Sequence, residues 1–251
     1  MISLITRVQY PDLHKRMMES AMNTALGEIE FLHERDADGL PKIAQTYNHL
    51  RDLAKGDIIV YLHDDVVFME EGWDARLTEF FASYPYDIGG VVGVDKYEGG
   101  QLVAAGHPHC FGKFVNRAGD ELRVNLYGPK SEGKELKAVD GMFIATRGKH
   151  RERFDEKLDG LFFYDLDYCL RGSVGLIDIL LGHWKPADRF GKYPKDMKPE
   201  DSYKPYFYAK HGLKEVEPGD TRALCASQED FANVGHDKLW KLFQEKYLVT
   251  A

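Results

Sequence analysis

The chain has 251 residues, of which 43% are hydrophobic and 29% charged, and its formal net charge is −8. This composition is typical of a folded globular protein and excludes a chain that is mainly disordered or of low complexity. The acidic balance also argues against nucleic acid or an anionic membrane surface as a general partner. The length fits one large domain, or one domain with an appendage.

Targeting signals are not evident in the sequence. No run reaches the roughly 20 consecutive apolar residues of a membrane-spanning helix, and the first residues lack the pattern of a signal peptide. The three cysteines, Cys110, Cys169 and Cys225, are scattered and form no CxxC pair, so neither a zinc site nor a disulfide framework is indicated. We therefore expect a cytoplasmic protein without a transmembrane segment.

The first 95 residues alternate predicted strands and predicted helices. Runs of β-branched and apolar residues predict strands at 2–8, 28–33, 57–62 and 88–94. Pro11 and Pro41 stand at the starts of two helices, where the missing N–H of proline costs nothing, and a third helix is predicted over 72–83. Strands separated by helices of this length predict a parallel sheet of βαβ units.

The pattern changes beyond Asp95. Residues 96–137 are rich in turn formers and predict irregular hairpins. Strand-like runs follow at 138–146 and 176–181, with a short helix predicted within 161–171. The four prolines from Pro186 to Pro205 argue against a regular helix or a central strand there, and helical periodicity returns at 228–247.

A run of polar residues, His63-Asp64-Asp65, directly follows the predicted buried strand at 57–62. In open α/β sheets, ligands bind at the carboxyl ends of the strands. Two carboxylates and an imidazole at this position can hold Mg²⁺ or Mn²⁺, ions that commonly bridge a protein to the phosphates of a substrate. The alternative interpretation is a solvated acidic turn.

Two further aspartates, Asp165 and Asp167, lie among aromatic and aliphatic neighbours. If a helix begins here, its dipole favours an anion at Asp165, and an apolar wall would raise the pKa of that carboxyl and make it a better base. Alternatively, one aspartate caps the helix and the other forms an ion pair. We predict a functional Asp165 and a structural Asp167 that pairs with Arg171, four positions further on.

Five motifs occur in order along residues 2–212. They are Ala44-Gln45-Thr46-Tyr47-Asn48 with the following His63-Asp64-Asp65-Val66, then Val139-Asp140-Gly141-Met142-Phe143-Ile144, Phe154-Asp155-Glu156 with Phe163-Tyr164-Asp165-Leu166-Asp167, His183, and Phe207-Tyr208-Ala209-Lys210-His211-Gly212. In this order they resemble the family 2 glycosyltransferases, and in particular the glycosyltransferase-like branch whose metal motif is His-any-Asp-Val. His183 alone would be read as a packed histidine; the other motifs give it weight as a metal ligand.

The resemblance implies an α/β protein of the GT-A type, with a Rossmann-like, mostly parallel central sheet flanked by helices and a C-terminal irregular or helical extension. It divides the chain into a glycosyltransferase domain at 1–212 and the extension at 213–251. Within the domain it implies a nucleotide-binding half at 1–95, an acceptor and catalytic half at 96–184 and a lid at 185–212.

The activity that the resemblance implies is inverting glycosyl transfer from a nucleotide-diphosphate sugar, with a UDP-sugar favoured, to the hydroxyl of an unknown acceptor. Asp165 would be the base, and Asp65, His183 and His63 would hold Mn²⁺ or Mg²⁺, which stabilises the leaving diphosphate. His63 replaces the usual aspartate and leaves one negative charge less at the metal. The other implied contacts are Asp64, Thr6, Glu34, Asp36 and Asn48 with the nucleotide, and Asp140, Trp184 and Tyr164 with the sugar or the acceptor.

Three alternatives stay open. The histidine at position 63 also suits a non-catalytic module that binds a nucleotide or a sugar. A metal-dependent phosphoesterase would use His63, Asp64 and His183. A nucleotidyltransferase ranks below these, because residues 6–10 contain no glycine for a phosphate-binding loop.

Overall fold

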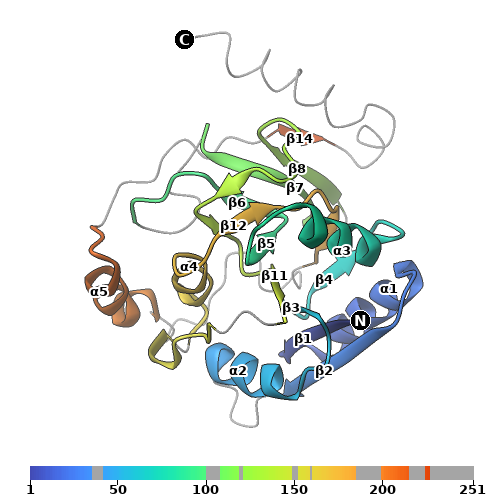
Figure 1. Ribbon diagram of the computed structural model, residues 1–251, viewed down its shortest axis with the longest axis horizontal. Helices are drawn as coiled ribbons and strands as arrows, with labels where there is room; N and C mark the ends of the chain where they lie inside the picture. The colour runs from blue at the N-terminus through green and yellow to red at the C-terminus, as the bar shows by residue number, and fades with distance from the viewer. Residues whose placement is uncertain are drawn as a thin grey trace.

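The computed structural model describes residues 1–35, 42–99, 108–118, 121–148, 152–158, 160–184, 199–214 and 224–226. Two sheets with helices packed against them make up this part of the chain (Figure 1). Its helices are α1 (Pro11–Thr24), α2 (Ile43–Leu53), α3 (Trp73–Ser83), α4 (Tyr164–Cys169) and α5 (Pro199–His211), with a 3₁₀ turn, η2, at Glu156–Leu158.

The larger sheet, sheet A, contains the predicted βαβ units. Its strand order is β2 (Ile29–Arg35), β1 (Ile2–Val8), β3 (Ile58–Leu62), β11 (Phe143–Arg147), β5 (Ile88–Gly90), β12 (Val174–Leu176) and β9 (Glu135–Leu136). β1 runs parallel to both β2 and β3, as expected, whereas β11 runs antiparallel to both β3 and β5. The sheet is therefore mixed, because a strand from the second half of the chain returns between β3 and β5.

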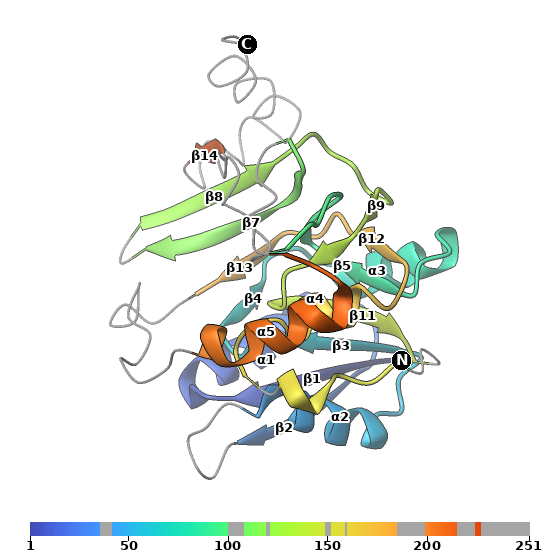
Figure 2. The same cartoon turned by 90° about the vertical axis from the view of Figure 1, so that its left-hand side faces the viewer.

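The second sheet, sheet B, consists of shorter strands and one long hairpin. Its strand order is β10 (Ala138–Val139), β6 (Val92–Val94), β7 (Cys110–Ala118), β13 (Leu181–His183) and β4 (Val66–Phe68), while β7 also pairs with β8 (Glu121–Tyr127) and β8 with β14 (Leu224–Ala226). Figure 2 shows the β7–β8 hairpin beyond one side of sheet A. The described part of the C-terminal extension thus adds a strand to sheet B.

Two apolar runs that predict single strands are each divided between the sheets. The predicted strand at 88–94 forms β5 in sheet A and β6 in sheet B, and the predicted strand at 176–181 spans the end of β12 in sheet A and the start of β13 in sheet B. Gly90 and Gly93 permit the chain to pass from β5 to β6. A Cβ at Gly90 would lie 2.4 Å from Val139, and a Cβ at Gly93 would lie 2.3 Å from the Ala138 carbonyl oxygen. The chain also crosses between the sheets from β3 to β4.

The core has two halves, one on each face of sheet A. Along β3, Ile59 and Tyr61 belong to the half that includes α2 and α4, whereas Val60 and Leu62 belong to the half that includes α1 and α3. Burial of both faces explains why β3 is apolar throughout instead of alternating with polar residues.

The helix α5 corrects one expectation, since residues 199–205 are helical despite their prolines. Pro199 is tolerated as the first helical residue, and Pro205 is accommodated inside the helix. The predicted helix at 228–247 and residues 185–198 of the predicted lid lie outside the described residues. Among the described helices, none combines the length and the apolar character needed to cross a lipid bilayer.

Candidate active site

The turn from β3 to β4 places three polar side chains where the chain passes from sheet A to sheet B. β3 ends at Leu62 and β4 begins at Val66, so His63, Asp64 and Asp65 fill the turn. The His63 backbone N–H donates a hydrogen bond of 3.2 Å to the Met142 carbonyl, just before β11. Both carboxylates are buried, and charges in such a position need a partner.

His63, Asp65 and His183 form a cluster whose ligand atoms, one from each residue, all lie within 4.8 Å of one another. His183 lies in this cluster because β13 pairs with β4 and places His183 opposite Val66. Its Nε2 lies 3.2 Å from Asp65 Oδ1 and, within the described residues, is buried without a hydrogen-bond partner. Converging buried atoms of this kind fit a divalent cation. Two imidazoles and a carboxylate suit a transition ion such as Mn²⁺ better than Mg²⁺, which prefers oxygen ligands.

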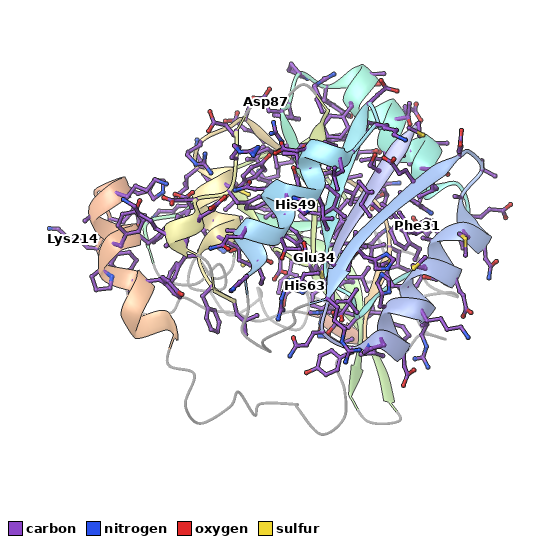
Figure 3. All side chains as sticks on the ribbon, turned by 90° about the horizontal axis from the view of Figure 1, so that it is seen from below. Phe31, Glu34, His49, His63, Asp87 and Lys214 are labelled. Carbon is purple, nitrogen blue, oxygen red and sulfur yellow. The ribbon has the colours of Figure 1, made fainter. Side chains whose placement is uncertain are left out.

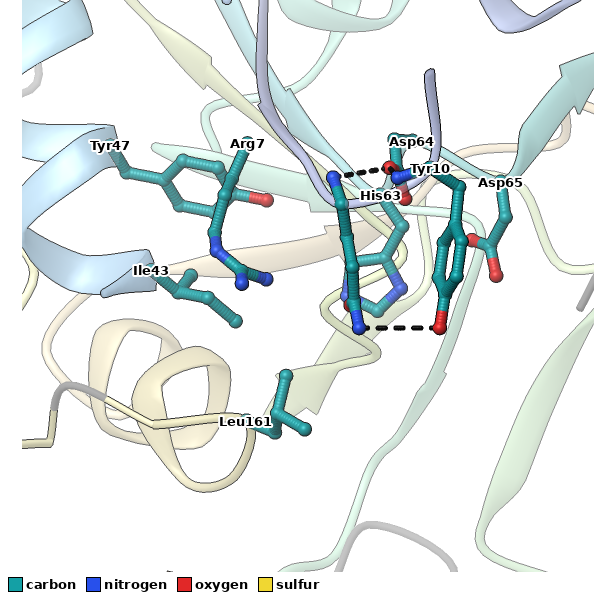
Figure 4. A pocket seen from close by; sticks show the side chains of 9 residues that line it. Arg7, Tyr10, Ile43, Tyr47, His63, Asp64, Asp65 and Leu161 are labelled. Carbon is teal, nitrogen blue, oxygen red and sulfur yellow. Dashed lines mark hydrogen bonds between the residues drawn. The ribbon is translucent and has the colours of Figure 1, made fainter. Parts of the chain in front are cut away.

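Asp64 is not part of this cluster and holds the loop that follows β1. Its Oδ2 accepts hydrogen bonds from the backbone N–H groups of Gln9, at 2.6 Å, and Tyr10, at 2.5 Å (Figure 4). Burial raises the pKa of the Asp64 carboxyl to about 6, against the opposing effect of the Tyr10 N–H. One oxygen of Asp64 thus has a structural use, which differs from the expected contact with the nucleotide.

A pocket opens beside the turn, at the carboxyl end of β1. Figure 4 shows its lining, which consists of Arg7, Gln9, Tyr10, Ile43, Tyr47, His63, Asp64, Asp65 and Leu161. The Arg7 side chain is only 8% exposed and brings a positive charge to a pocket that also includes two members of the cation cluster. Because Asp64 and Asp65 also line the pocket, it would be complementary to an anionic ligand only together with a bound cation.

Asp165, the second residue of α4, has the environment expected of a base. Its Oδ2 accepts a hydrogen bond of 3.0 Å from the Gly141 N–H, and its Oδ1 accepts one of 2.9 Å from the Leu166 N–H. Burial, and then the neighbouring Asp140 carboxylate, raise the pKa of Asp165 to about 7. A half-buried carboxyl with this pKa can take up a proton near neutral pH.

Asp167, two residues further on, is structural, as the sequence predicts. Arg171 NH2 lies 3.0 Å from its Oδ2, which is the predicted pair four positions apart. Its other oxygen lies 2.6 Å from Lys210 Nζ and 2.8 Å from His211 Nε2, both at the end of α5. Asp167 is fully buried, so these contacts fasten α5 to α4.

The two aromatic residues expected to contact the sugar or the acceptor both take part in packing. Tyr164 is fully buried, and its hydroxyl lies 2.9 Å from His63 Nε2 and 3.4 Å from the Gly141 carbonyl oxygen. Its ring therefore has no face open to a sugar. Trp184 packs over Gly182, where a Cβ would lie 1.7 Å from the indole ring, and against a small apolar cluster. The ring of Tyr164 is thus used in packing, whereas Trp184 is half-buried and its contact with the sugar or the acceptor stays a prediction.

The residues expected to contact the nucleotide are dispersed. Thr6 is fully buried near the end of β1, and Glu34 is exposed near the end of β2. Asn48 is a correction: its amide group donates to the Phe154 carbonyl and accepts from the Phe154 N–H, both at 2.9 Å, so it joins α2 to a distant loop. Asp36 lies outside the described residues.

Asp140, expected to contact the sugar or the acceptor, is half-buried. Its Oδ1 accepts a hydrogen bond of 2.9 Å from the Met142 N–H. Its charge acts on Asp165, so it lies beside the candidate base.

Sequence reasoning missed several pocket residues, including Gln9, Tyr10 and Leu161. No motif marks them. Tyr47, in contrast, belongs to one of the motifs that carry the resemblance, and it lines the pocket from α2.

The fold indicates a class of protein. The mixed sheet, in which β1 has two parallel neighbours, is of the Rossmann-like type that GT-A glycosyltransferases share. The chain belongs to the Glycosyltransferase like family, whose model matches residues 4–185. A comparison with curated proteins gives no match.

Solved structures of glycosyltransferases share the fold at low sequence identity. A structure of GalNAc-T7 with UDP, GalNAc and Mn²⁺ is 14% identical with a TM-score of 0.53, over 98% of this chain and 56% of that one. A structure of TarS from S. aureus is 10% identical with a TM-score of 0.51, over 86% of this chain and 40% of that one. A structure of TarS residues 1–349 in complex with UDP-GlcNAc is 10% identical with a TM-score of 0.52, over 86% of this chain and 68% of that one. The chain thus spans about half the length of the first two proteins.

Proposed function

We propose that this protein is an inverting glycosyltransferase that moves a sugar from a nucleotide-diphosphate sugar to an acceptor hydroxyl. The observation that carries the proposal is that His63 and Asp65 of the His63–Asp65–His183 cluster line the pocket, while Asp165 directly follows Tyr164, whose hydroxyl lies 2.9 Å from His63 Nε2. The charges of Asp65 and Asp165 both act on the hydroxyl of Tyr47, which lines that pocket. A cation site and a base that face one ligand are what a displacement at a sugar phosphate needs.

The roles follow from the chemistry of the groups. His63, Asp65 and His183 would hold the cation, with Mn²⁺ preferred, and when bound it would supply positive charge to the leaving diphosphate. Arg7 would add a second positive charge in the pocket. Asp165 would accept the proton of the acceptor hydroxyl as its oxygen bonds to the anomeric carbon. The bond from that carbon to the diphosphate oxygen breaks with its electron pair on the diphosphate, and a single displacement inverts the carbon.

The donor we favour is a UDP-sugar. Structures that share the fold contain UDP with GalNAc, or UDP-GlcNAc. The phosphoesterase alternative is weakened, because one oxygen of Asp64 is engaged by two backbone N–H groups and Asp64 is not among the residues of the cation cluster.

The direct test is Asp165→Asn, with Asp87→Asn as the matched control. Asp87 is an aspartate on the side of the molecule opposite His63 (Figure 3). The measurement is release of nucleoside diphosphate from a panel of UDP-sugars with Mn²⁺, followed by NMR of the anomeric configuration of the product. We expect Asp165→Asn to lose about 10²–10⁴-fold in turnover and Asp87→Asn to keep its activity.

Full activity in a folded Asp165→Asn protein would contradict the assigned base, and a product with retained configuration would contradict the single displacement. A wild-type protein that binds UDP and Mn²⁺ but turns over no donor would instead support the binding-module alternative.

A further inference from the structure

Tyr164 joins the cation cluster to the segment that holds the candidate base. Its hydroxyl contacts His63 Nε2 at 2.9 Å on one side and the Gly141 carbonyl oxygen at 3.4 Å on the other. The N–H of the same glycine donates to Asp165. A hydrogen-bonded path thus runs from a proposed cation ligand through one buried phenol to the backbone that holds the base.

The Tyr164 hydroxyl donates to the Gly141 carbonyl oxygen, whereas the role of His63 Nε2 toward the phenol oxygen depends on the tautomer of the ring. A backbone carbonyl only accepts, so the single O–H of Tyr164 is donated to Gly141. With that hydrogen engaged, the phenol oxygen can only accept, so the contact favours the tautomer of His63 that carries its hydrogen on Nε2. A neutral imidazole carries one hydrogen, so Nδ1 of His63 retains its lone pair.

We propose that Tyr164 is a positioning residue that fixes His63 in the tautomer with its hydrogen on Nε2 and so reserves Nδ1 for the cation. This inference rests on the proposed function, in which His63 is a cation ligand. Histidines that bind metals are usually oriented by a hydrogen bond to their other nitrogen, and loss of that bond typically weakens metal binding by about 10–100-fold.

The glycine at position 141 is shaped to this arrangement. A Cβ at Gly141 would lie 2.2 Å from the Tyr164 hydroxyl and 3.1 Å from Asp165 Oδ2. Any side chain there would displace the phenol oxygen from its place between His63 and the carbonyl. Residue 141 thus allows both α4 residues to approach one stretch of backbone.

The test compares Tyr164→Phe with Tyr168→Phe. Each substitution removes only a hydroxyl from a fully buried ring, and both rings pack against Phe154. Tyr168→Phe is therefore matched to Tyr164→Phe in helix, burial and neighbours. The contact with His63 belongs to Tyr164. Folding of both variants is checked by thermal unfolding.

The first measurement is ¹⁵N NMR of the full chain with labelled histidine, without metal, with the His63 signals identified by their loss in His63→Gln. We expect the Nε2–H tautomer in wild type and in Tyr168→Phe, and a mixture of tautomers in Tyr164→Phe. The second measurement is Mn²⁺ affinity by EPR titration without donor or acceptor, where Tyr164→Phe is expected to bind about 10–100-fold more weakly.

An unchanged tautomer in Tyr164→Phe would overturn the inference, and so would an equal loss of Mn²⁺ affinity in both variants. If wild type binds no Mn²⁺ but Tyr164→Phe still alters the His63 tautomer, the orienting contact is supported while the metal-assisted function fails. The two failures are therefore distinguishable.

Discussion

The two sides of α4 hold one aspartate each, and their surroundings differ. On the pocket side, Asp165 has neutral backbone N–H groups as partners and another carboxylate nearby, and the pKa of its carboxyl is raised to about 7. On the α5 side, Asp167 contacts three basic side chains in a fully buried position. Two carboxyls two residues apart thus have different surroundings: Asp165, the proposed base, has no cationic partner among these contacts, whereas Asp167 joins two helices.

The largest effect that tests this comparison is on stability. Asp167→Asn keeps the shape of the side chain but leaves Lys210, Arg171 and His211 without their shared anion. Breaking a buried ion pair by removing one partner typically costs about 3–5 kcal/mol. We expect a loss of this size in the free energy of unfolding, measured with urea at pH 7. A loss no greater than that of Asp165→Asn would show that the two carboxyls do not differ in the way described.

The second prediction concerns the pH dependence of activity. A base must be deprotonated to act, so kcat/KM is expected to rise about tenfold per pH unit at acidic pH and to level off above about 7, the pKa of Asp165. The profile of kcat/KM in wild type checks this. A plateau that already begins near pH 4 would place the base elsewhere or in a more solvated environment.

The sequence predicts the part of the fold that depends on local pattern. β1 and β3 follow from runs of β-branched and apolar residues, β2 follows from its alternating pattern, and the helices between them follow from the prolines and glycines at their ends. The division of residues 88–94 between two sheets does not follow, because an apolar run has the same appearance whether or not the strand changes partners. Gly90 and Gly93 were the available signal, since close approach of another strand requires their missing side chains.

The sequence predicts those residues of the candidate site that directly follow a strand. Asp65 and His183 were proposed as ligands from the resemblance, but their meeting depends on the pairing of β4 with β13, two three-residue strands that no local pattern connects. Asn48 shows the opposite case. The resemblance implied a contact of Asn48 with the nucleotide, whereas its amide binds the backbone of Phe154, 106 residues away. Contacts over such separations depend on the tertiary fold.

The third prediction is a smaller effect of pH on stability. A carboxyl has a pKa near 3.8 in the unfolded chain, whereas that of Asp165 is about 7 when folded. Between these values the unfolded state loses a proton that the folded state keeps, so stability falls as pH rises from about 4 to 7 and is level above that. The part due to Asp165 is on the order of 1–3 kcal/mol, after allowance for its partial exposure.

Urea unfolding of wild type and Asp165→Asn at several pH values measures this contribution as a difference in slope. Asp64, with a pKa of about 6, adds a slope of the same sign in both proteins and cancels in the comparison. Equal slopes would contradict the raised pKa of Asp165.

The smallest expected effect tests whether burial is what makes Asp167 important. Asp52 also forms an aspartate–arginine pair, with both Arg153 terminal nitrogens 2.7 Å from its oxygens, but the side chains are 53% and 47% exposed. Exposed pairs contribute about 0.2–1 kcal/mol because water screens them and their side chains lose entropy. Asp52→Asn should therefore lower the free energy of unfolding by less than about 1 kcal/mol. If it costs as much as Asp167→Asn, the geometry of the ion pair and not its burial determines the difference, and α5 would owe its attachment to contacts other than Asp167.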